Sequence, residues 1–280
     1  MWLTMTIEIL ICTIDRGIDN AAKVLMPPHK GISYLVSWQQ TPALESAEVP
    51  VELRRDDVRV VTLSGKGLAR NRNNAISHAK ADICVLADDD VRYEPAKLIS
   101  ALEVFTTHPS LDIATFKYES RYSPKHYPAY PFDFRNRPRF YYVASIEIAF
   151  RRTSVQGRLC FNELFGLGAE ALTAGEEEIL MLDAMQLGLD CRFFPMAIVH
   201  HDSPSTCTHS AASPGFIMAK GALVRILNRY GYMPRYFVEA YRLNRQCHCG
   251  MLFAFKMLRR GGIYAQQHKL LRYDIKKIFQ

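Results

Sequence analysis

The sequence has no long hydrophobic run. No stretch approaches the about 18 consecutive apolar residues that a membrane-spanning helix needs. Residues 1–6 show neither a basic leader nor a long apolar segment, so no signal peptide is expected. We therefore expect a soluble protein of the cytoplasm, with peripheral contact to the inner face of the membrane as an open alternative.

The cysteines follow no disulfide or zinc pattern. They number seven, an odd count, and are scattered along the chain, which favours a reducing compartment without a disulfide framework. Cys247-His248-Cys249 lacks the usual zinc-ligand spacing and a second pair. We interpret these residues as ordinary thiols in a helix.

The common nucleotide-binding fingerprints are also missing. Gly65-Lys66-Gly67 is not followed by the Lys-Ser/Thr of a P-loop and lacks the third glycine of a dinucleotide motif. An apolar face at helical spacing nevertheless predicts a helix from Leu68 to Ala79, with Lys66 and Arg70 near its N-terminus. Such a terminus with nearby cations suits a phosphate group, although a plain basic helix fits this stretch equally well.

The charge balance is basic. Lys and Arg number 35 against 28 Asp and Glu, giving a net charge of +7. This favours an anionic substrate, nucleic acid or an anionic membrane surface as a partner. The basic residues look dispersed and no nucleic-acid recognition motif is found, so nucleic acid is not expected.

Three consecutive aspartates stand out in this sequence. Asp88, Asp89 and Asp90 directly follow the apolar stretch 83–87, which predicts a buried strand. Carboxylates this close repel one another unless a cation or hydrogen-bond donors offset the repulsion. Mg²⁺ and Mn²⁺ favour oxygen ligands, so a metal site is one interpretation. A solvated acidic turn with Asp90 as a helix cap is the other.

Strands and helices alternate along the chain, which predicts an α/β fold. We expect a domain over residues 1–212 and a helical extension over 213–280. The expected strands are 7–13, 33–37, 58–63, 83–87, 113–118, 141–150 and 191–199. Residues 119–140, rich in Pro, Tyr, Arg and Phe, predict a long functional loop. Within the extension, residues 253–260 fit either core packing or an anionic membrane.

Two later polar clusters are candidate site residues. Glu176, Glu177 and Glu178 begin a predicted helix, where the macrodipole favours acidic residues, but one of them has room to face a cleft. His200 and His201 end a predicted strand, where they fit a metal ligand and its orienting partner or a plain polar turn.

Taken together, these motifs resemble the family 2 glycosyltransferases of the GT-A fold. The resemblance extends over about residues 7–206 and is carried by 9–15 (ILICTID), 67–75 (GLARNRNNA), 86–91 (LADDDV), 161–166 (FNELFG), 175–178 (GEEE) and 201–206 (HDSPST). It implies a Rossmann-like, mainly parallel sheet flanked by helices. It also implies an inverting enzyme of polysaccharide synthesis that uses a nucleotide-diphosphate sugar and passes the sugar to a glycan or lipid-linked acceptor.

The resemblance implies four donor contacts before the acidic triplet. Thr13 and Asp15 would contact the base and ribose, and Lys66 and Arg70 the base or diphosphate. The second strand departs from the family pattern, since residues 37–40 read Ser-Trp-Gln-Gln where an acidic pair is usual. Base recognition is therefore expected to differ.

The triplet would bind the rest of the donor. By resemblance, Asp88 and Asp89 contact the ribose and the metal, and Asp90 stands in the last place of the DxD pattern as a ligand of Mn²⁺ or Mg²⁺. Asp89 and Asp90 both satisfy the alignment, and His201 would be a further ligand.

The catalytic base is the last implied role. Glu177 aligns with the general base of the family, with Glu176 as the secondary candidate. The family has Asp at the position of Glu177, and a shift of about 1 Å in a carboxylate can cost about 100-fold in rate.

Two other functions stay open at this stage. A metal-dependent nucleotidyltransferase would also use carboxylates and Mg²⁺ on an α/β sheet, but would not need Glu177. A non-catalytic basic module for membrane or nucleic acid would explain the charge alone.

Overall fold

The computed structural model describes residues 5–44, 47–122, 124–201 and 212–279. Within these ranges nine strands form one mixed sheet in the order β3-β2-β1-β4-β8-β6-β9-β5, with β7 paired to β9. The strands are β1 (Ile7–Ile14), β2 (Ile32–Gln40), β3 (Val58–Ser64), β4 (Ile83–Asp88), β5 (Val91–Tyr93), β6 (Ile113–Glu119), β7 (Phe132–Asp133), β8 (Ile148–Arg151) and β9 (Cys191–His201).

The first four strands of this order are all parallel. β1 pairs in parallel with β2 and β4, and β2 pairs in parallel with β3. β8 then runs antiparallel to β4 and β6, while β6 and β9 are parallel. The predicted mixed, mainly parallel α/β sheet is confirmed.

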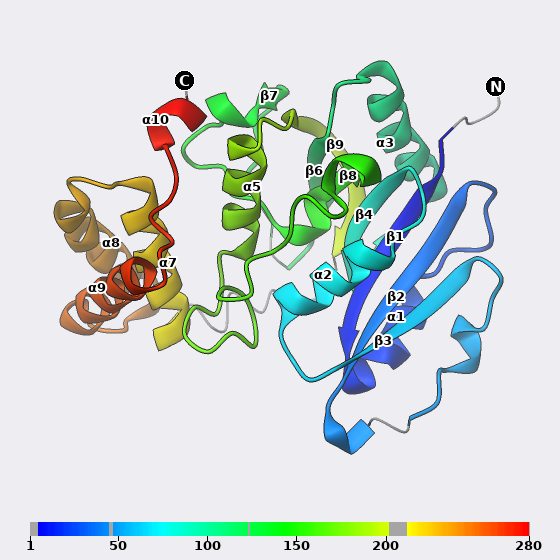
Figure 1. Ribbon diagram of the computed structural model, residues 1–280, viewed down its shortest axis with the longest axis horizontal. Coiled ribbons are helices and arrows are strands. Elements are labelled where there is room, and N and C mark those ends of the chain that lie inside the picture. The colour runs from blue at the N-terminus through cyan, green and yellow to red at the C-terminus, as the bar shows by residue number, and fades with distance from the viewer. Residues whose placement is uncertain (1–4, 45–46, 123, 202–211, 280) are drawn as a thin grey trace.

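Helices cover both faces of the sheet (Figure 1). The helices are α1 (Ile18–Val24), α2 (Leu68–His78), α3 (Pro95–Thr107), α4 (Arg152–Val155), α5 (Glu176–Gln186), α7 (Pro214–Leu227), α8 (Tyr232–Cys247), α9 (Met251–Gln267) and α10 (Ile275–Ile278). β1 shows why two layers form, because side chains alternate across a strand. Ile9 and Ile11 join the core under α1 and α3, while Leu10 and Cys12 join the core under α2 and α5.

The predicted helical extension is present as α7 to α10, at the end of the molecule far from β2 and β3 (Figure 1). α7 and α9 cross at backbone contact. A Cβ atom on Gly221 would clash with the carbonyl of Leu258, and one on Gly261 with the carbonyl of Met218. No helix in the described ranges has the length and apolarity to cross a bilayer.

Three local features differ from the predicted elements. Residues 141–150 were expected to be a strand, but only 148–151 is one, and Ser145–Glu147 forms a 3-10 turn. β5 was not predicted at all. His200 and His201 were expected at the end of the last strand, with a polar turn as one alternative; they belong to β9 and pair with Arg92 and Val91 of β5.

Candidate active site

A cavity of about 1390 Å³ runs from the carboxyl ends of β1, β2 and β4, past the start of α5, to α7 and α8. Its walls come from parts of the chain far apart in sequence. The sheet end contributes Thr13, Gln39, Asp88, Asp89 and Asp90, the middle contributes Glu176, Glu177, Glu178 and His201, and the helical end contributes Lys220, Leu223, Arg235 and Arg242. Most of the sequence-predicted site residues therefore share one space.

The acidic triplet occupies the sheet end of this cavity. Asp88 is the last residue of β4 and lies opposite Cys12 of β1. The hydroxyl of Thr13 donates a hydrogen bond to Asp89, and burial raises the pKa of the Asp89 carboxyl. Gly17 leaves room for this contact, since a Cβ atom there would clash with both side chains. Asp89 is thus held by β1, while Asp88 and Asp90 are the more exposed carboxylates.

A divalent cation fits the donor chemistry at this end. Oδ2 of Asp90 lies 3.3 Å from Nε2 of His201, and both side chains line the cavity. Among the described residues no three acidic, His or Cys side chains converge as a closed metal cage. Mg²⁺ is commonly held by one or two carboxylates, with substrate phosphates and water as the remaining ligands. Of the predicted ligands, Asp90 and His201 thus lie close together, and a metal site at Asp89, Asp90 and His201 stays a prediction.

His200 has different surroundings from its neighbour. Its Nε2 lies 2.8 Å from Glu94 and its Nδ1 lies 3.1 Å from Glu119, with Lys97 also at 2.8 Å. It is not part of the described cavity wall. Of the two histidines, only His201 lies where a ligand of the site is needed. The rest of the predicted motif 201–206 lies outside the described residues.

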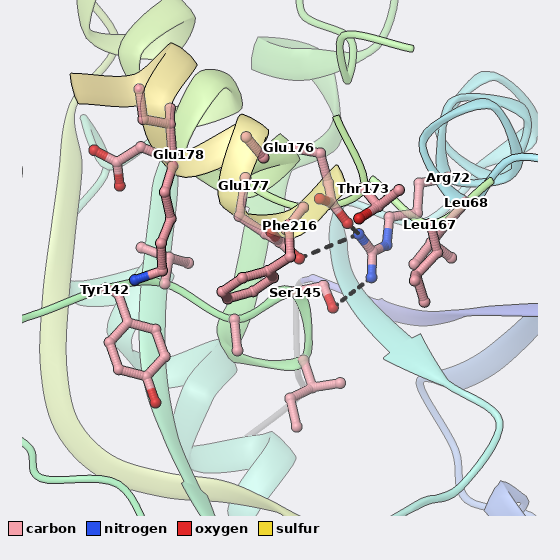
Figure 2. A pocket seen from close by; sticks show the side chains of 18 of the residues that line it. Leu68, Arg72, Tyr142, Ser145, Leu167, Thr173, Glu176, Glu177, Glu178 and Phe216 are labelled. Atoms are coloured by element: carbon pink, nitrogen blue, oxygen red, sulfur yellow. Dashed lines mark hydrogen bonds and ion pairs between the residues drawn. The ribbon is translucent and has the colours of Figure 1, made fainter. Parts of the chain in front are cut away.

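Arg72 connects the acidic triplet to the start of α5. Its Nη2 lies 3.4 Å from Asp88, and its Nη1 lies 3.0 Å from Glu176 and 3.2 Å from Glu177. Nη2 also donates a 2.6 Å hydrogen bond to the hydroxyl of Ser145 (Figure 2). Only 3% of the Arg72 side chain is exposed. Its guanidinium therefore neutralises carboxylates that would otherwise repel one another away from water.

This role of Arg72 was not predicted from the sequence. Helical spacing placed Arg72 with Leu68, Ala75 and Ile76 on a buried face, and it is indeed buried. Its partners Glu176 and Glu177 are 104 and 105 positions away, so no local pattern reveals them. A charged residue on an otherwise apolar helix face was the available signal, because a buried charge requires a partner.

Of the three glutamates at the start of α5, Glu177 is the one that fits a general base. Burial raises the pKa of its carboxyl to about 8, the adjacent Glu176 adds to the rise, and Arg72 opposes it. A carboxylate with a pKa near neutrality is a more effective proton acceptor than an ordinary one. Glu176 is more deeply buried and packs under Gly166, where a Cβ atom would come within 2.9 Å of its carboxyl carbon. Glu176 therefore has the position of a support for Arg72.

Glu178 has a different partner from Glu176 and Glu177. Its Oε2 accepts a 2.8 Å hydrogen bond from Arg137, a residue of the predicted functional loop. The loop is also tied down by Lys125, whose Nζ lies 2.5 Å from Glu147. Tyr127 donates a 2.6 Å hydrogen bond to the same carboxylate. The described residues of this loop thus form a wall beside Glu177, anchored through buried ion pairs.

Two buried amide groups have atoms without hydrogen-bond partners. Within the described residues, Nε2 of Gln39 and Oδ1 of Asn71 are the buried side-chain polar atoms left unpaired. Both residues line the cavity. The other amide atom of Asn71 donates a 2.8 Å hydrogen bond to the carbonyl of Thr13, which fixes the amide orientation. Unpaired buried polar groups are costly, so this donor and acceptor are suited to a polar ligand.

Of the remaining residues predicted to contact the nucleotide sugar, some line the cavity and others do not. Lys66 lines the cavity, but Asp15 and Arg70 are not in its described wall. The carboxylate of Asp15 accepts hydrogen bonds from the backbone and hydroxyl of Thr41, at 2.8 and 3.0 Å. Arg70 is exposed on α2. The roles of Asp15 and Arg70 in binding stay predictions.

The N-terminus of α2 is partly covered. The backbone N–H of Leu68 donates a 2.8 Å hydrogen bond to the carbonyl of Leu167, and Gly168 packs against Gly67. Figure 2 shows Leu68 and Leu167 next to each other beside Arg72. One of the free N–H groups expected to bind phosphate is therefore already occupied, which leaves Lys66 as the predicted phosphate contact at this edge.

The middle of the chain matches a known protein family. Residues 42–158 match the model of glycosyl transferase family 2. The matched segment contains Lys66, Arg72 and the acidic triplet. The resemblance to family 2 glycosyltransferases that the sequence predicted is confirmed over this segment. A search of curated proteins gave no match to the chain.

Solved structures show the same fold. The crystal structure of S. aureus TarS matches with a TM-score of 0.54 at 17% identity, over 86% of this chain and 43% of TarS. S. aureus TarS 1-349 in complex with UDP-GlcNAc gives a TM-score of 0.57 at 17% identity, over 93% of this chain and 79% of that one. The UDP complex gives 0.52 at 15% identity, over 86% and 71%. The chain thus spans less than half of full TarS, and the GT-A fold is confirmed.

Proposed function

We propose that this chain is an inverting glycosyltransferase that moves a sugar from a nucleotide-diphosphate sugar to a saccharide acceptor. One observation carries the proposal: Asp88 and Glu177 line a single cavity and share the buried Arg72, at 3.4 and 3.2 Å. A donor bound at the triplet would therefore place its reacting carbon on the side of Glu177. The family 2 segment and the TarS complexes with UDP-GlcNAc and UDP support this choice of donor.

The sheet end of the cavity would bind the nucleotide. Gln39 and Asn71 offer an unpaired donor and an unpaired acceptor, which suits the edge of a base. Thr13, Lys66 and Asp88 lie on the same wall and would contact ribose and diphosphate. The amide side chain of Gln39 would take the place of the acidic residue that is usual in the family.

Asp89, Asp90 and His201 would hold Mn²⁺ or Mg²⁺. When bound, the ion supplies Lewis-acid stabilisation of the charge on the leaving nucleotide. The protein contributes the ordering of these ligands. Thr13 fixes Asp89, and β5 pairing with β9 brings Asp90 next to His201.

Glu177 would act as the general base. It accepts the proton of an acceptor hydroxyl as that oxygen attacks the anomeric carbon from the face opposite the nucleotide, and the single displacement inverts the configuration. Arg72 holds the Glu177 carboxylate in position, while the Gly-rich turn 166–168 and the loop wall limit access of water.

The helical end of the cavity would bind the acceptor. Arg139 of the loop, Tyr142 shortly after it, and Leu223 and Arg235 of the extension all line the cavity. An aromatic and basic wall with apolar patches suits a glycan or a lipid-linked saccharide. We place the reaction in the synthesis of a cell-surface polysaccharide.

Calorimetric titration with UDP, GDP and dTDP, each with and without Mn²⁺, tests the donor site. We expect one nucleotide to bind in a metal-dependent way and Asp90→Ala to abolish that dependence. Asp56→Ala, at an exposed acidic residue outside the cavity, is the matched control and should bind like the unchanged protein. The donor assignment fails if none of the nucleotides shows metal-dependent binding.

Product analysis then tests the reaction. Release of a nucleoside diphosphate from a nucleotide sugar, lost in Glu177→Gln with nucleotide binding intact, is the expected result. Release of pyrophosphate from a nucleoside triphosphate would favour the nucleotidyltransferase instead. Full transfer by Glu177→Gln would remove Glu177 from the mechanism.

A further inference from the structure

The positive charge of the chain is concentrated in its C-terminal helices. Residues 214–280 contain 13 of the 35 Lys and Arg but only 2 of the 28 Asp and Glu, a net charge of +11. The rest of the chain, with 22 basic and 26 acidic residues, has a net charge of −4. The expectation that the basic residues are dispersed was therefore wrong. Between Glu239 and Asp274 the sequence has no acidic residue at all.

α8 presents three different faces. One is buried against α7 and α9 through Tyr236, Ala240 and Leu243. The next, with Arg235, Val238 and Arg242, lines the helical end of the cavity. The third face points outward and is apolar, with Met233, Phe237 and Tyr241 at four-residue spacing and Phe237 and Tyr241 about half exposed. An outward apolar stripe on a helix that already has a buried face calls for a partner.

α9 extends this outward face. Leu252, Lys256, Arg259 and Ile263 are exposed and recur at three- or four-residue spacing, and 87% of Leu252 is exposed. Phe237 of α8 stacks on Phe255 of α9 with ring centroids 4.4 Å apart, which joins the two stripes. We call Met233, Phe237, Tyr241, Leu252, Lys256 and Arg259 together the α8–α9 surface.

The structure separates the two interpretations of residues 253–260. Ala254, Met257 and Leu258 of this stretch are buried in the packing of the helical extension. Lys256, Arg259 and Arg260 remain exposed. Core packing is thus confirmed for Ala254, Met257 and Leu258, whereas Phe253 and the cations remain exposed.

We propose that the α8–α9 surface binds an anionic membrane surface. Its apolar stripe with basic residues beside it is the pattern of helices that lie in the membrane interface. The part of the surface from Tyr241 to Arg259 lies in the stretch between Glu239 and Asp274 that has no acidic residue. The charge complementarity is specific to an anionic surface, because clustered Lys and Arg are attracted by acidic lipids. Nucleic acid would engage the cations but gain nothing from Leu252 and Phe237. A second copy of the chain would oppose like charges across the interface.

The location of this surface connects it to the cavity. The outward face and the cavity face are adjacent on α8, since Phe237 belongs to one and Val238 to the other. Figure 1 shows α8 and α9 at the outer end of the molecule. A membrane bound there lies beside the helical end of the cavity. For the proposed glycosyltransferase, on which this step rests, a membrane-anchored acceptor would enter from that side.

Vesicle flotation tests the proposal with the full chain. We expect binding to phosphatidylcholine vesicles that contain phosphatidylglycerol, no binding to pure phosphatidylcholine, and weaker binding at high salt. Leu252→Ser should weaken binding by about tenfold. Lys256→Glu with Arg259→Glu should weaken it by at least about tenfold. All three side chains are exposed, so the fold should be unaffected.

Matched controls lie on the catalytic part of the chain. Leu187→Ser replaces a half-exposed leucine at the end of α5, and Arg158→Glu reverses an exposed charge. Both should bind vesicles like the unchanged protein. Asp90→Ala should also keep vesicle binding while it loses metal-dependent nucleotide binding, so failure of the donor site and failure of the membrane surface are distinguishable.

Three results would overturn the proposal. Equal binding to neutral and anionic vesicles, or none to either, removes the charge complementarity. Competition by a single-stranded polynucleotide with no effect of Leu252→Ser would assign the surface to nucleic acid. A dimer in light scattering that Leu252→Ser converts to monomer would assign the apolar stripe to self-association.

Discussion

Nη1 of Arg72 lies 3.2 Å from Oε1 of Glu177, and only 3% and 16% of these two side chains are exposed. The pair connects α2, beside the proposed nucleotide-sugar site, to Glu177, which we propose as the general base. Its geometry makes the position of Glu177 dependent on a residue that contacts neither substrate in the proposed mechanism. Arg72 is therefore a positioning residue, and its removal should affect stability and proton transfer together.

The first prediction concerns the stability of this ion-pair cluster. Arg72→Leu removes the cation that pairs with the buried Glu176 and that hydrogen-bonds Glu177, so we expect a loss of about 3–5 kcal/mol in the free energy of unfolding. Urea denaturation measures it. Arg70→Leu is the matched control, two residues away on the same helix but exposed, and should change stability by less than about 0.5 kcal/mol. Equal effects of the two variants would contradict the assignment.

The second prediction concerns pH. With a pKa of about 8, Glu177 is mostly protonated at neutral pH, so kcat/KM should rise with pH until about 8 and then level off. Replacing Arg72 by Leu should move this rise to higher pH, because the positive charge of Arg72 is the largest influence that lowers the pKa of Glu177. Glu170→Gln, at an exposed glutamate, should keep the profile of the unchanged protein. A flat profile would argue against Glu177 as the base.

The raised pKa of Glu177 also makes the stability of the fold depend on pH. The folded protein keeps a proton on Glu177 up to about pH 8, whereas the unfolded chain loses it near 4.5. The unfolded state therefore binds fewer protons between these values, and the contribution of Glu177 to the free energy of unfolding falls as pH rises through this window. Glu177→Gln should weaken this dependence.

The third prediction concerns nucleotide binding by Gln39. Gln39→Leu removes a buried donor without a partner, so the free protein should be as stable as before or more stable. Nucleotide affinity should nevertheless fall, by about tenfold, because the base loses that donor. In Gln40→Leu the pattern should reverse: Nε2 of Gln40 donates to the carbonyl of Leu44 at 3.3 Å, so stability falls while affinity is retained. An unchanged affinity in Gln39→Leu would exclude the contact.

A fourth prediction tests the close packing of α9 against α7. Gly261→Ala would normally favour a helix by about 1 kcal/mol. Here the added Cβ meets the carbonyl of Met218 on α7, so we expect a net loss of about 1–3 kcal/mol. Arg260→Ala, exposed on the same helix, should show no such loss. A more stable Gly261→Ala protein would show that α7 and α9 do not cross as closely as described.

The sequence allowed prediction wherever a local pattern decided the structure. The apolar run of β1 and the helical spacing of α2 depend on neighbours in sequence, and both elements form where expected. The stretch 141–150 failed because its shape is set at long range. Lys125 and Tyr127, 22 and 20 residues upstream, hold Glu147 and with it the 3-10 turn that replaces a strand.

The candidate site also combines features that a local sequence pattern predicts with features that depend on long-range contacts. The triplet and Glu177 were singled out by the resemblance to family motifs, because acidic residues after a strand or at a helix start also form turns and caps. Gln39 drew attention only as a departure from an acidic pair. Its unpaired amide depends on what surrounds it in three dimensions, and so do the separate surroundings of His200 and His201.

The three glutamates at the start of α5 point in three directions: Glu176 toward the centre of the ion-pair cluster, Glu177 toward the cavity, and Glu178 toward Arg137 of the loop. Successive residues on an α-helix are rotated by about 100°. The three positions are therefore chemically identical but not interchangeable. Deleting any one of them would leave the composition of the segment almost unchanged and yet rotate every following residue out of its place. The segment therefore has to preserve its length as well as its residue types.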